Sequence, residues 1–436
     1  MLRHRLCHAL LGASALALAP QAAHALRVDY TIDLTAERND NLLLTPVDPI
    51  SLTVLRPGIG FEVFHDSSTL QTRITGRGEY RHYGDSRFDD VVDGTLSGRV
   101  NWVAIPERLR FTVVDNLTLQ PVNTLAPDTP GNRQQVNVLS AGPTLSFEWG
   151  NSWRGETELR YIRSEAEVTE QFNSGRIDLA LRAIKPLSTT SRLALNAQIQ
   201  RVDFEDDIFA RDYTRSEFFA RYSRTLNLFD IAIDAGYSRL RYRRDFPGQA
   251  SSRSDPMLRT ALSWRPNASH RFDARFSSEF SDMAASSLAS EGAELPSEVV
   301  TGDTVINASP FLVRRIGTEY AYSATRWTFS VSPYVERLRY EDTDEFDRNG
   351  SGGGLEATWR ARRNLMLGMT ASLNRTDYVN LNREDETRRF GSYVRYDWAQ
   401  HWSSTLSLSR HQRNSTAAGQ DADQNAVSLT FSYDNR

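Results

Sequence analysis

The chain of 436 residues carries a formal net charge of -4, and 39% of its residues are hydrophobic while 24% are charged. This balance is too polar for a bundle of membrane helices, and so mild a charge gives no reason to expect a nucleic-acid partner. The length allows two or three ordinary domains or one large closed sheet, so the periodicity of the sequence has to decide between them.

The first residues have the pattern of an export signal. A basic start ends at Arg5, an apolar run covers residues 9–18, and Ala23-His24-Ala25 forms a small-x-small cleavage site. We therefore predict a signal peptide over residues 1–25; the alternative is an uncleaved anchor, for which the apolar run is short of the roughly 20 residues of a spanning helix. Cys7 is the only cysteine, so the mature chain would hold no disulfide and no thiol metal site.

A strand pattern begins directly after the signal. Apolar side chains occupy every second position, at Val28, Tyr30, Ile32, Leu34 and Ala36. The intervening positions are mostly polar, which gives the strand one apolar and one polar face. No later stretch approaches 18 uninterrupted apolar residues, so only a closed β-barrel could carry this chain across a bilayer.

A two-faced hairpin then recurs along the chain. In the clearest copy, one arm covers residues 91–103, the chain turns around Pro106, and the second arm covers residues 109–113. The spacing of the turns, about forty residues, fits two spanning strands joined by one short and one long connection. We predict tight reversals near Ser67, Pro106, Asn151, Leu187, Leu226, Asn267, Ala324, Arg362 and Gln400.

The other connections are longer and acidic. They include Asp203–Asp212, Glu341–Gly354 and Asn414–Asp423, and Ser281–Thr301 is the longest. Short turns on one rim and long loops on the other are typical of outer-membrane barrels. We predict one all-β domain over residues 26–436, a single closed antiparallel transmembrane β-barrel of about 16–20 strands, with 20 as the best value. A β-propeller or soluble sandwich is the alternative, although each repeat has two long strands rather than four short ones.

The positions of the tryptophans give a partly independent indication of a transmembrane barrel. All eight lie within a few residues of a predicted tight turn. They are Trp102, Trp149, Trp153, Trp264, Trp327, Trp359, Trp398 and Trp402. Because indole prefers the membrane–water interface, we predict an aromatic girdle at the periplasmic rim; the alternative is that these residues mark ordinary hairpin cores.

The polar strand faces would form the lumen wall of such a barrel. The predicted lumen-lining arginines are Arg73, Arg77, Arg81, Arg99, Arg110, Arg160, Arg182, Arg271, Arg275, Arg389 and Arg395. The predicted lumen-lining carboxylates are Glu79, Asp93, Glu156, Glu158, Asp178, Asp273 and Glu279. Lys185 is the only lysine, so nearly all positive charge is guanidinium, which binds carboxylates in bidentate fashion. These side chains could contact an anionic or sugar-like solute, or they could stiffen the wall by pairing across strands. For any individual arginine we favour cross-strand pairing.

No catalytic or cofactor site is expected. The five histidines of the mature chain form no HExxH motif and no paired metal spacing, so we predict a protein that is not an enzyme and holds no cofactor or metal. The acidic run Asp342–Asp347 could hold calcium but lacks the ligand order of an EF-hand loop, which favours a solvated loop. With no room for a plug before the first strand, Ser281–Thr301 is the candidate for a constriction inside the lumen; an external lid is the alternative.

The N-terminal quarter of the mature chain also carries a motif-level resemblance. The matching features are Glu37-Arg38-Asn39-Asp40-Asn41-Leu42 after the first strand, Thr45-Pro46, Leu55-Arg56-Pro57-Gly58 entering the second, and Tyr80 and Tyr83 closing the third. In these features the chain resembles a Gram-negative β-barrel porin family that includes EpsL-type outer-membrane proteins of exopolysaccharide operons. The chain departs from outer-membrane barrels at its end, where three polar residues follow the aromatic Tyr433.

The resemblance implies a function and a location. It implies a passive hydrophilic path in exopolysaccharide export or assembly, in the outer membrane of a Gram-negative bacterium after signal-peptide cleavage. The implied partners are outer-membrane lipid, polysaccharide or small hydrophilic solutes, and polysaccharide-export machinery. Two alternatives stay open: a general or solute-specific porin for small-molecule uptake, and a non-conducting envelope scaffold.

Overall fold

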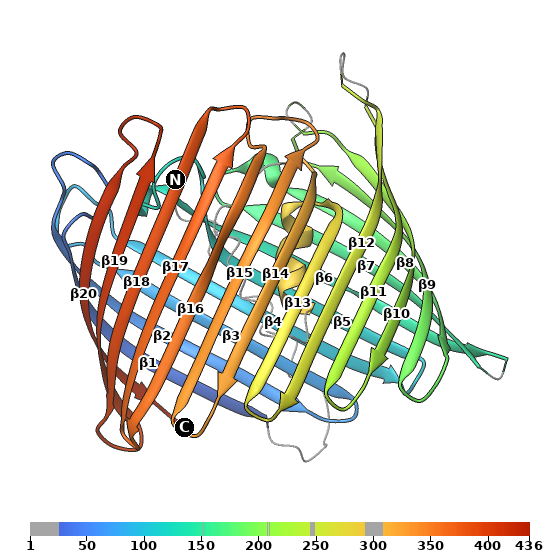
Figure 1. Ribbon diagram of the computed structural model, residues 1–436, viewed down its shortest axis with the longest axis horizontal. Coiled ribbons are helices and arrows are strands. Elements are labelled where there is room, and N and C mark those ends of the chain that lie inside the picture. Colours follow the sequence, from blue (N-terminus) through green and yellow to red (C-terminus); the bar gives the residue numbers. More distant parts are fainter. Residues whose placement is uncertain (1–25, 151, 207, 209, 245–248, 293–307) are drawn as a thin grey trace.

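A computed structural model describes residues 26–436 except for 151, 207, 209, 245–248 and 293–307. The chain forms one closed antiparallel sheet of 20 strands, which confirms the predicted barrel and its strand number (Figure 1). The signal peptide predicted over residues 1–25 lies outside the described residues. Within the part of the chain that is described, no helix is long and apolar enough to cross a membrane.

Each strand pairs with its neighbours in the sequence, and β20 pairs with β1 to close the barrel. The strands are β1 (Arg27–Asn39), β2 (Leu52–Asp66), β3 (Leu70–Arg81), β4 (Val91–Ile105), β5 (Leu109–Pro121), β6 (Arg133–Trp149), β7 (Trp153–Ala166), β8 (Ser174–Pro186), β9 (Ser191–Phe204), β10 (Tyr213–Thr225), β11 (Phe229–Tyr242), β12 (Ser252–Asn267), β13 (His270–Ser281), β14 (Phe311–Ser323), β15 (Trp327–Tyr340), β16 (Arg348–Arg362), β17 (Leu365–Tyr378), β18 (Arg383–Asp397), β19 (Trp402–Ser415) and β20 (Ala422–Asp434). Among the described residues, one α-helix, α1 (Met283–Gly292), and two short 3-10 helices, η2 (Pro130–Asn132) and η3 (Glu170–Phe172), lie in the connections.

Short connections gather at one rim and long ones at the other, as the hairpin repeat predicts. Eight of the nine predicted reversals lie at the turn of a hairpin, with Asn267 and Arg362 as the last residues of β12 and β16, and the ninth, Asn151, lies outside the described residues. In the β4–β5 turn, the backbone N–H of Arg108 donates to the carbonyl of Ile105 at 3.1 Å, and Glu107 adopts the left-handed region at φ 61°. The C-terminus lies at the rim of short turns (Figure 1).

The predicted C-terminal limit of the loop Glu341–Gly354 is wrong, because the loop ends before Arg348. Strand β16 begins at Arg348 and pairs with β15 through the glycine-rich stretch that follows. Glycine serves close strand packing here rather than a loop, because a Cβ at Gly352 would lie 2.4 Å from the backbone oxygen of Leu373. Composition alone could not distinguish the two uses of glycine.

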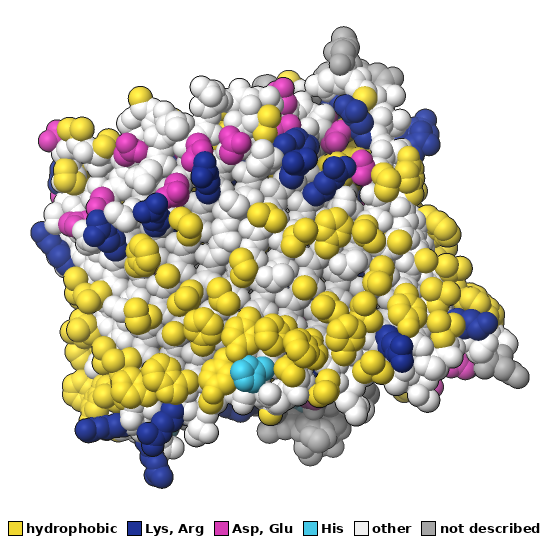
Figure 2. Space-filling view, viewed as in Figure 1, with side chains coloured by type: hydrophobic (Ala, Val, Ile, Leu, Met, Phe, Trp, Pro, Cys, Tyr) yellow, Lys and Arg dark blue, Asp and Glu magenta, His cyan; other side chains and the backbone are white. Residues whose placement is uncertain are grey.

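Strand alternation gives the barrel two unlike faces. On β1, the outward side chains Ile32 and Leu34 are each 51% exposed, whereas Asp33 and Thr35 between them are only 6% and 4% exposed. Figure 2 shows the outcome on one side of the barrel: apolar side chains form a broad band across it, and charged side chains lie above and below this band. The apolar band faces outward, so the polar strand faces turn inward.

The polar end of the chain adds contacts to the seam between the first and last strands. The backbone N–H of Tyr30 donates to the Asn435 side chain at 2.7 Å, and the Asn435 amide donates to the carbonyl of Val28 at 3.2 Å. Arg436 forms an ion pair with Asp29 at 2.9 Å. These contacts tie the residues that follow the last aromatic side chain to β1.

Candidate channel lumen

The pairing registers put the predicted lumen residues on the strand face opposite to the exposed apolar side chains. They lie on β3 (Arg73, Arg77, Glu79, Arg81), β4 (Asp93, Arg99), β5 (Arg110), β7 (Glu156, Glu158, Arg160), β8 (Asp178, Arg182), β13 (Arg271, Asp273, Arg275, Glu279) and β18 (Arg389, Arg395). This placement follows from the period of two in a strand. Which of these side chains contact one another, in contrast, follows only from the three-dimensional structure.

One network of charges joins the inner faces of β1 to β4. Arg77 makes a bidentate contact with Asp33, at 2.6 and 2.8 Å, although 44 positions separate the two residues. Arg81 lies between Glu79 at 3.1 Å and Asp93 at 2.8 Å. Alternating charges on neighbouring strands satisfy one another, which stiffens the wall and leaves it hydrophilic.

A second group on β5 to β8 holds arginines and carboxylates in equal number, but not every arginine is paired. Arg182 pairs with Glu158 at 2.9 Å, and Arg160 lies 3.6 Å from the same carboxylate. Arg110 is exposed on the inner face and contributes its charge to the surroundings of Arg160. Within the described part of the chain Arg110 forms no ion pair, so its guanidinium is available to a passing anion.

A third network of charges joins β10 to β13. Its central arginine is Arg259, which was not among the arginines predicted to line the lumen. Arg221 binds Asp234 through two contacts of 2.6 Å. Arg259 lies 2.7 Å from Glu279, 3.1 Å from Glu217 and 3.6 Å from Asp234. The alternation of β12 could have assigned Arg259 to the inner face, but not its place between three carboxylates of three different strands.

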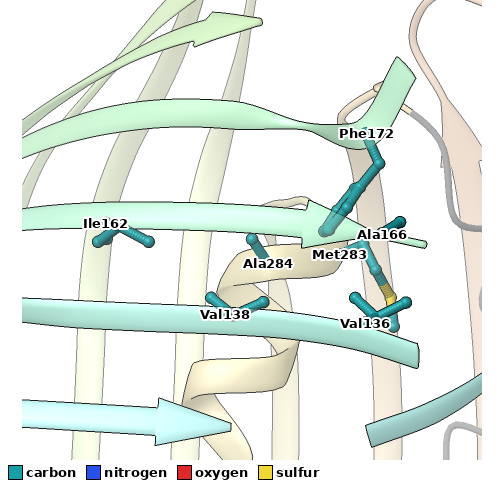
Figure 3. Close-up of a cluster of buried hydrophobic side chains, with 7 residues drawn as sticks. All are labelled: Val136, Val138, Ile162, Ala166, Phe172, Met283 and Ala284. Atoms are coloured by element: carbon teal, nitrogen blue, oxygen red, sulfur yellow. The ribbon is translucent and has the colours of Figure 1, made fainter. Parts of the chain in front are cut away.

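The longest connection folds inward at its start. Helix α1 follows β13 directly and packs Met283 and Ala284 against Val136 and Val138 of β6. Figure 3 shows these side chains together with Ile162, Ala166 and Phe172, in a cluster between the helix and the inner face of β6 and β7. The side-chain amide of Asn116 on β5 also donates to the backbone oxygen of Ser287 at 3.0 Å. The sequence alone leaves open whether this segment lies inside the lumen or forms an external lid. The described helix α1 lies inside the barrel.

Asp282 fixes the start of this helix. Its carboxylate accepts the backbone N–H of Ala285 at 3.0 Å, which caps α1. It also accepts a hydrogen bond from Arg176 at 2.5 Å and from the Tyr213 hydroxyl at 2.9 Å. Burial by itself would raise the pKa of Asp282, but the guanidinium groups of Arg176 and Arg215 lower it to about 2. The carboxylate is therefore charged at neutral pH and holds α1 to the walls formed by β8 and β10.

The tryptophans lie at the rim of short turns. Seven belong to strand ends near these turns and Trp398 lies in the β18–β19 turn. Trp327 and Trp359 stack across two strands with ring centroids 5.4 Å apart and an interplanar angle of 12°. Trp153 is half-buried, and the Lys185 ammonium lies 5.4 Å from the centre of its ring. These contacts lie along one edge of the apolar band.

The acidic loop between β15 and β16 is held by hydrogen bonds. Asp347 accepts the backbone N–H of Tyr340 at 2.7 Å, and Asp342 pairs with Arg211 at 3.0 Å. Burial raises the pKa of Asp342, and Arg211 opposes that change. Among the described residues, no group of three histidine, cysteine or acidic side chains has a metal-binding arrangement.

This combination of an apolar outer band, a charged inner face and an unbroken ring of tilted strands defines the architecture of outer-membrane β-barrels. Comparison with solved structures gives the same architecture. The siderophore receptor PirA from Acinetobacter baumannii is 8% identical, with a TM-score of 0.50, over 95% of this chain and 81% of that one.

Other solved barrels align with lower structural similarity. The FrpB iron transporter from Neisseria meningitidis (F5-1 variant) is 8% identical over 93% of this chain and 82% of that one, with a TM-score of 0.48. OccAB4 from Acinetobacter baumannii is 9% identical over 94% of this chain and 99% of that one, with a TM-score of 0.37. At such low sequence identity, the similarity to these structures concerns the fold alone. No family model matches the sequence, and no curated protein matches it, so the EpsL-type resemblance gains no support from either comparison.

Proposed function

We propose that this protein is a passive outer-membrane channel for small hydrophilic solutes and that it favours anions. The observation that carries the proposal is the inner face, where the paired charges of β1 to β4 and β10 to β13 coexist with the exposed guanidinium of Arg110 on β5, which forms no ion pair among the described residues. Such a wall orders water and offers bidentate contacts to carboxylates. Solute uptake is therefore preferred to the export of exopolysaccharide.

The inward position of α1 also supports a small solute. The helix lies against the inner faces of β5 and β6 and takes space from the lumen at that level. A wide barrel needs a structure of this kind to limit what passes. A polysaccharide in transit would have to pass α1 or displace it, whereas a small anion could pass beside it along the arginines of the wall.

The signal peptide over residues 1–25 and the outer-membrane location belong to the same proposal. The test is fractionation of the producing bacterium, followed by N-terminal sequencing of the protein from the outer-membrane fraction. We expect a mature chain that begins at Leu26 and migrates faster on gels before heating than after, as closed barrels do. A protein recovered from the periplasm would contradict the proposed location.

Conductance and a deletion strain test the function. In planar bilayers, the purified protein is expected to conduct, with a reversal potential that indicates preference for chloride over potassium in a salt gradient. Deletion is expected to slow uptake of small anionic solutes and to leave extracellular polymer unchanged. Loss of polymer with normal uptake would favour polysaccharide export instead, and absence of conductance would favour a scaffold.

A further inference from the structure

Two arginines of β11 point outward rather than into the lumen. Arg239 and Arg241 are exposed and share a strand face with Tyr237, which is 52% exposed. Tyr237 pairs with Phe218 of β10, which is 62% exposed. The two guanidinium groups therefore lie next to the apolar band, on the side that faces lipid.

The position of these arginines across the bilayer follows from their distance to the rim of short turns. Phe229 pairs with Trp264 at the rim of short turns, and Arg239 lies ten positions further along β11. At a rise of about 3.4 Å per residue, this is about 34 Å along the strand. With strands tilted by about 45°, it is about 24 Å across the bilayer, which matches the roughly 25 Å apolar band of such barrels. Arg239 thus lies at the level of the outer headgroups.

Hydroxyl groups surround the two guanidinium groups. Arg239 pairs with Ser216 on one side and Ser254 on the other, and Arg241 pairs with Thr214 and Ser252 in the same way. Residues directly opposite in neighbouring strands have Cβ atoms about 5 Å apart, so these hydroxyls and guanidinium groups lie on one small patch. Guanidinium and hydroxyl donors together fit the oxygens of a phosphate group.

Carboxylates do not neutralise this patch. Within the part of the chain described by the structure, neither Arg239 nor Arg241 forms an ion pair. Two nearby arginines behave differently, because Arg201 lies 2.9 Å and Arg243 lies 2.6 Å from Asp203. The charge of the patch is thus left for an external anion.

A similar arrangement occurs on β14 and β15. Arg314 and Arg337 are direct cross-strand partners on the same face as Ile316 and Val335, which are 49% and 51% exposed. Like charges in this position destabilise a sheet unless an anion lies between them. The nearest carboxylate to Arg314 is that of Asp255, at 3.8 Å. Figure 2 shows basic side chains along this edge of the apolar band.

We propose that Arg239 and Arg241 bind the phosphate group of an anionic lipid of the outer leaflet. The guanidinium groups and the four neighbouring hydroxyls contact the phosphate, and the acyl chains lie over Tyr237 and Phe218. The adjoining apolar surface is what distinguishes a lipid headgroup from free phosphate as the ligand. This site lies on the outer surface and is independent of conduction through the lumen.

Lipid binding by the purified full-length barrel tests the proposal. The barrel is titrated in detergent with phosphatidic acid, with phosphatidylcholine of the same chains, and with inorganic phosphate, and bound lipid is counted by native mass spectrometry. We expect phosphatidic acid to bind in preference to the other two. The double variant Arg239→Gln/Arg241→Gln should weaken that binding by about tenfold or more, since each lost charge-assisted hydrogen bond is worth about that factor.

Arg410→Gln is the matched control, because Arg410 also faces outward but is neutralised by Asp423 at 2.7 Å. Its affinity for phosphatidic acid should stay within about twofold of wild type. Heat-modifiable migration on gels verifies that each variant is folded. Equal affinity of wild type and double variant, an equal loss in the control, or displacement of the lipid by an equal concentration of inorganic phosphate would each overturn the proposal.

Discussion

At the scale of single residues, arginine has three distinct environments in this barrel. Arg77 is bound by carboxylates on the inner face, Arg110 lies on the inner face without an ion pair among the described residues, and Arg239 faces the lipid. All three belong to strands with similar alternation, so sequence predicts their face but not their partners. Partners depend on register, which only the assembled sheet defines.

Arg110 is the side chain whose loss should change selectivity without changing stability. Because it forms no ion pair within the described part, Arg110→Ala removes a charge from the lumen wall but leaves no carboxylate unpaired. We expect the chloride preference in planar bilayers to fall, with the thermal midpoint of unfolding within about 1 °C of wild type. An unchanged reversal potential would show that Arg110 does not contact the ions that pass.

Arg77→Ala should have the opposite effect. It leaves the carboxylate of Asp33, a residue only 6% exposed, without its bidentate partner. An unsatisfied buried acceptor costs about 1–3 kcal/mol, so we expect a lower midpoint in urea unfolding of the purified barrel. Arg73→Ala on the same strand is the control, because Arg73 is highly exposed and lies 3.7 Å from Glu62. Equal midpoints for the two variants would contradict the assignment.

At the scale of elements, helix α1 depends on a contact between distant parts of the chain. Arg176 and Asp282 are 106 positions apart and both side chains are almost fully buried. Arg176→Met leaves Asp282 buried without its closest cation, which typically costs about 3–5 kcal/mol. We expect α1 to leave the wall, seen as faster hydrogen exchange at its backbone amides and a larger or noisier single-channel conductance. Unchanged exchange would show that the apolar contacts with β6 suffice.

Acid should release the same helix. The pKa of Asp282 in the folded protein, about 2, lies below the ordinary value near 3.9 because Arg176 and Arg215 favour the charged form over the opposing effect of burial. The carboxylate therefore stabilises the docked helix fully above about pH 4, and this contribution is lost as the pH falls toward 2. We expect conductance noise to rise in that interval in wild type. Asp282→Asn should lack this rise; an identical acid response in both proteins would assign the change to other carboxylates.

The turns were predictable and the loops were not, for a physical reason. Each tight reversal is defined by local residues between two alternating arms, so the eight reversals at described residues could be located from the sequence. The limits of the long connections depend on how far neighbouring strands extend, as Arg348–Gly354 shows by pairing on both sides. The inward course of α1 depends on Val136, Phe172 and Arg176, which lie far away in sequence.

At the scale of the whole molecule, the even strand number places the start of β1 and the end of β20 at the same rim and lets β20 close on β1. Counting alternating arms gave this number, because every arm contributes one spanning strand. The function does not follow from the count in the same way. It depends on the lumen left beside α1, and on a charge distribution that is set by pairs across neighbouring strands.

The tryptophan rim allows a test of how the whole barrel lies in a bilayer. All eight indoles lie near the short turns, and seven of them are between 39% and 61% exposed. If the apolar band spans the lipid, these rings lie at one interface and none lies at the bilayer centre. In vesicles, lipids brominated near the headgroup should therefore quench tryptophan fluorescence more strongly than lipids brominated near the chain ends. Trp327→Phe/Trp359→Phe should reduce the signal but keep this order of quenching, whereas stronger quenching by deep bromine atoms would contradict the orientation.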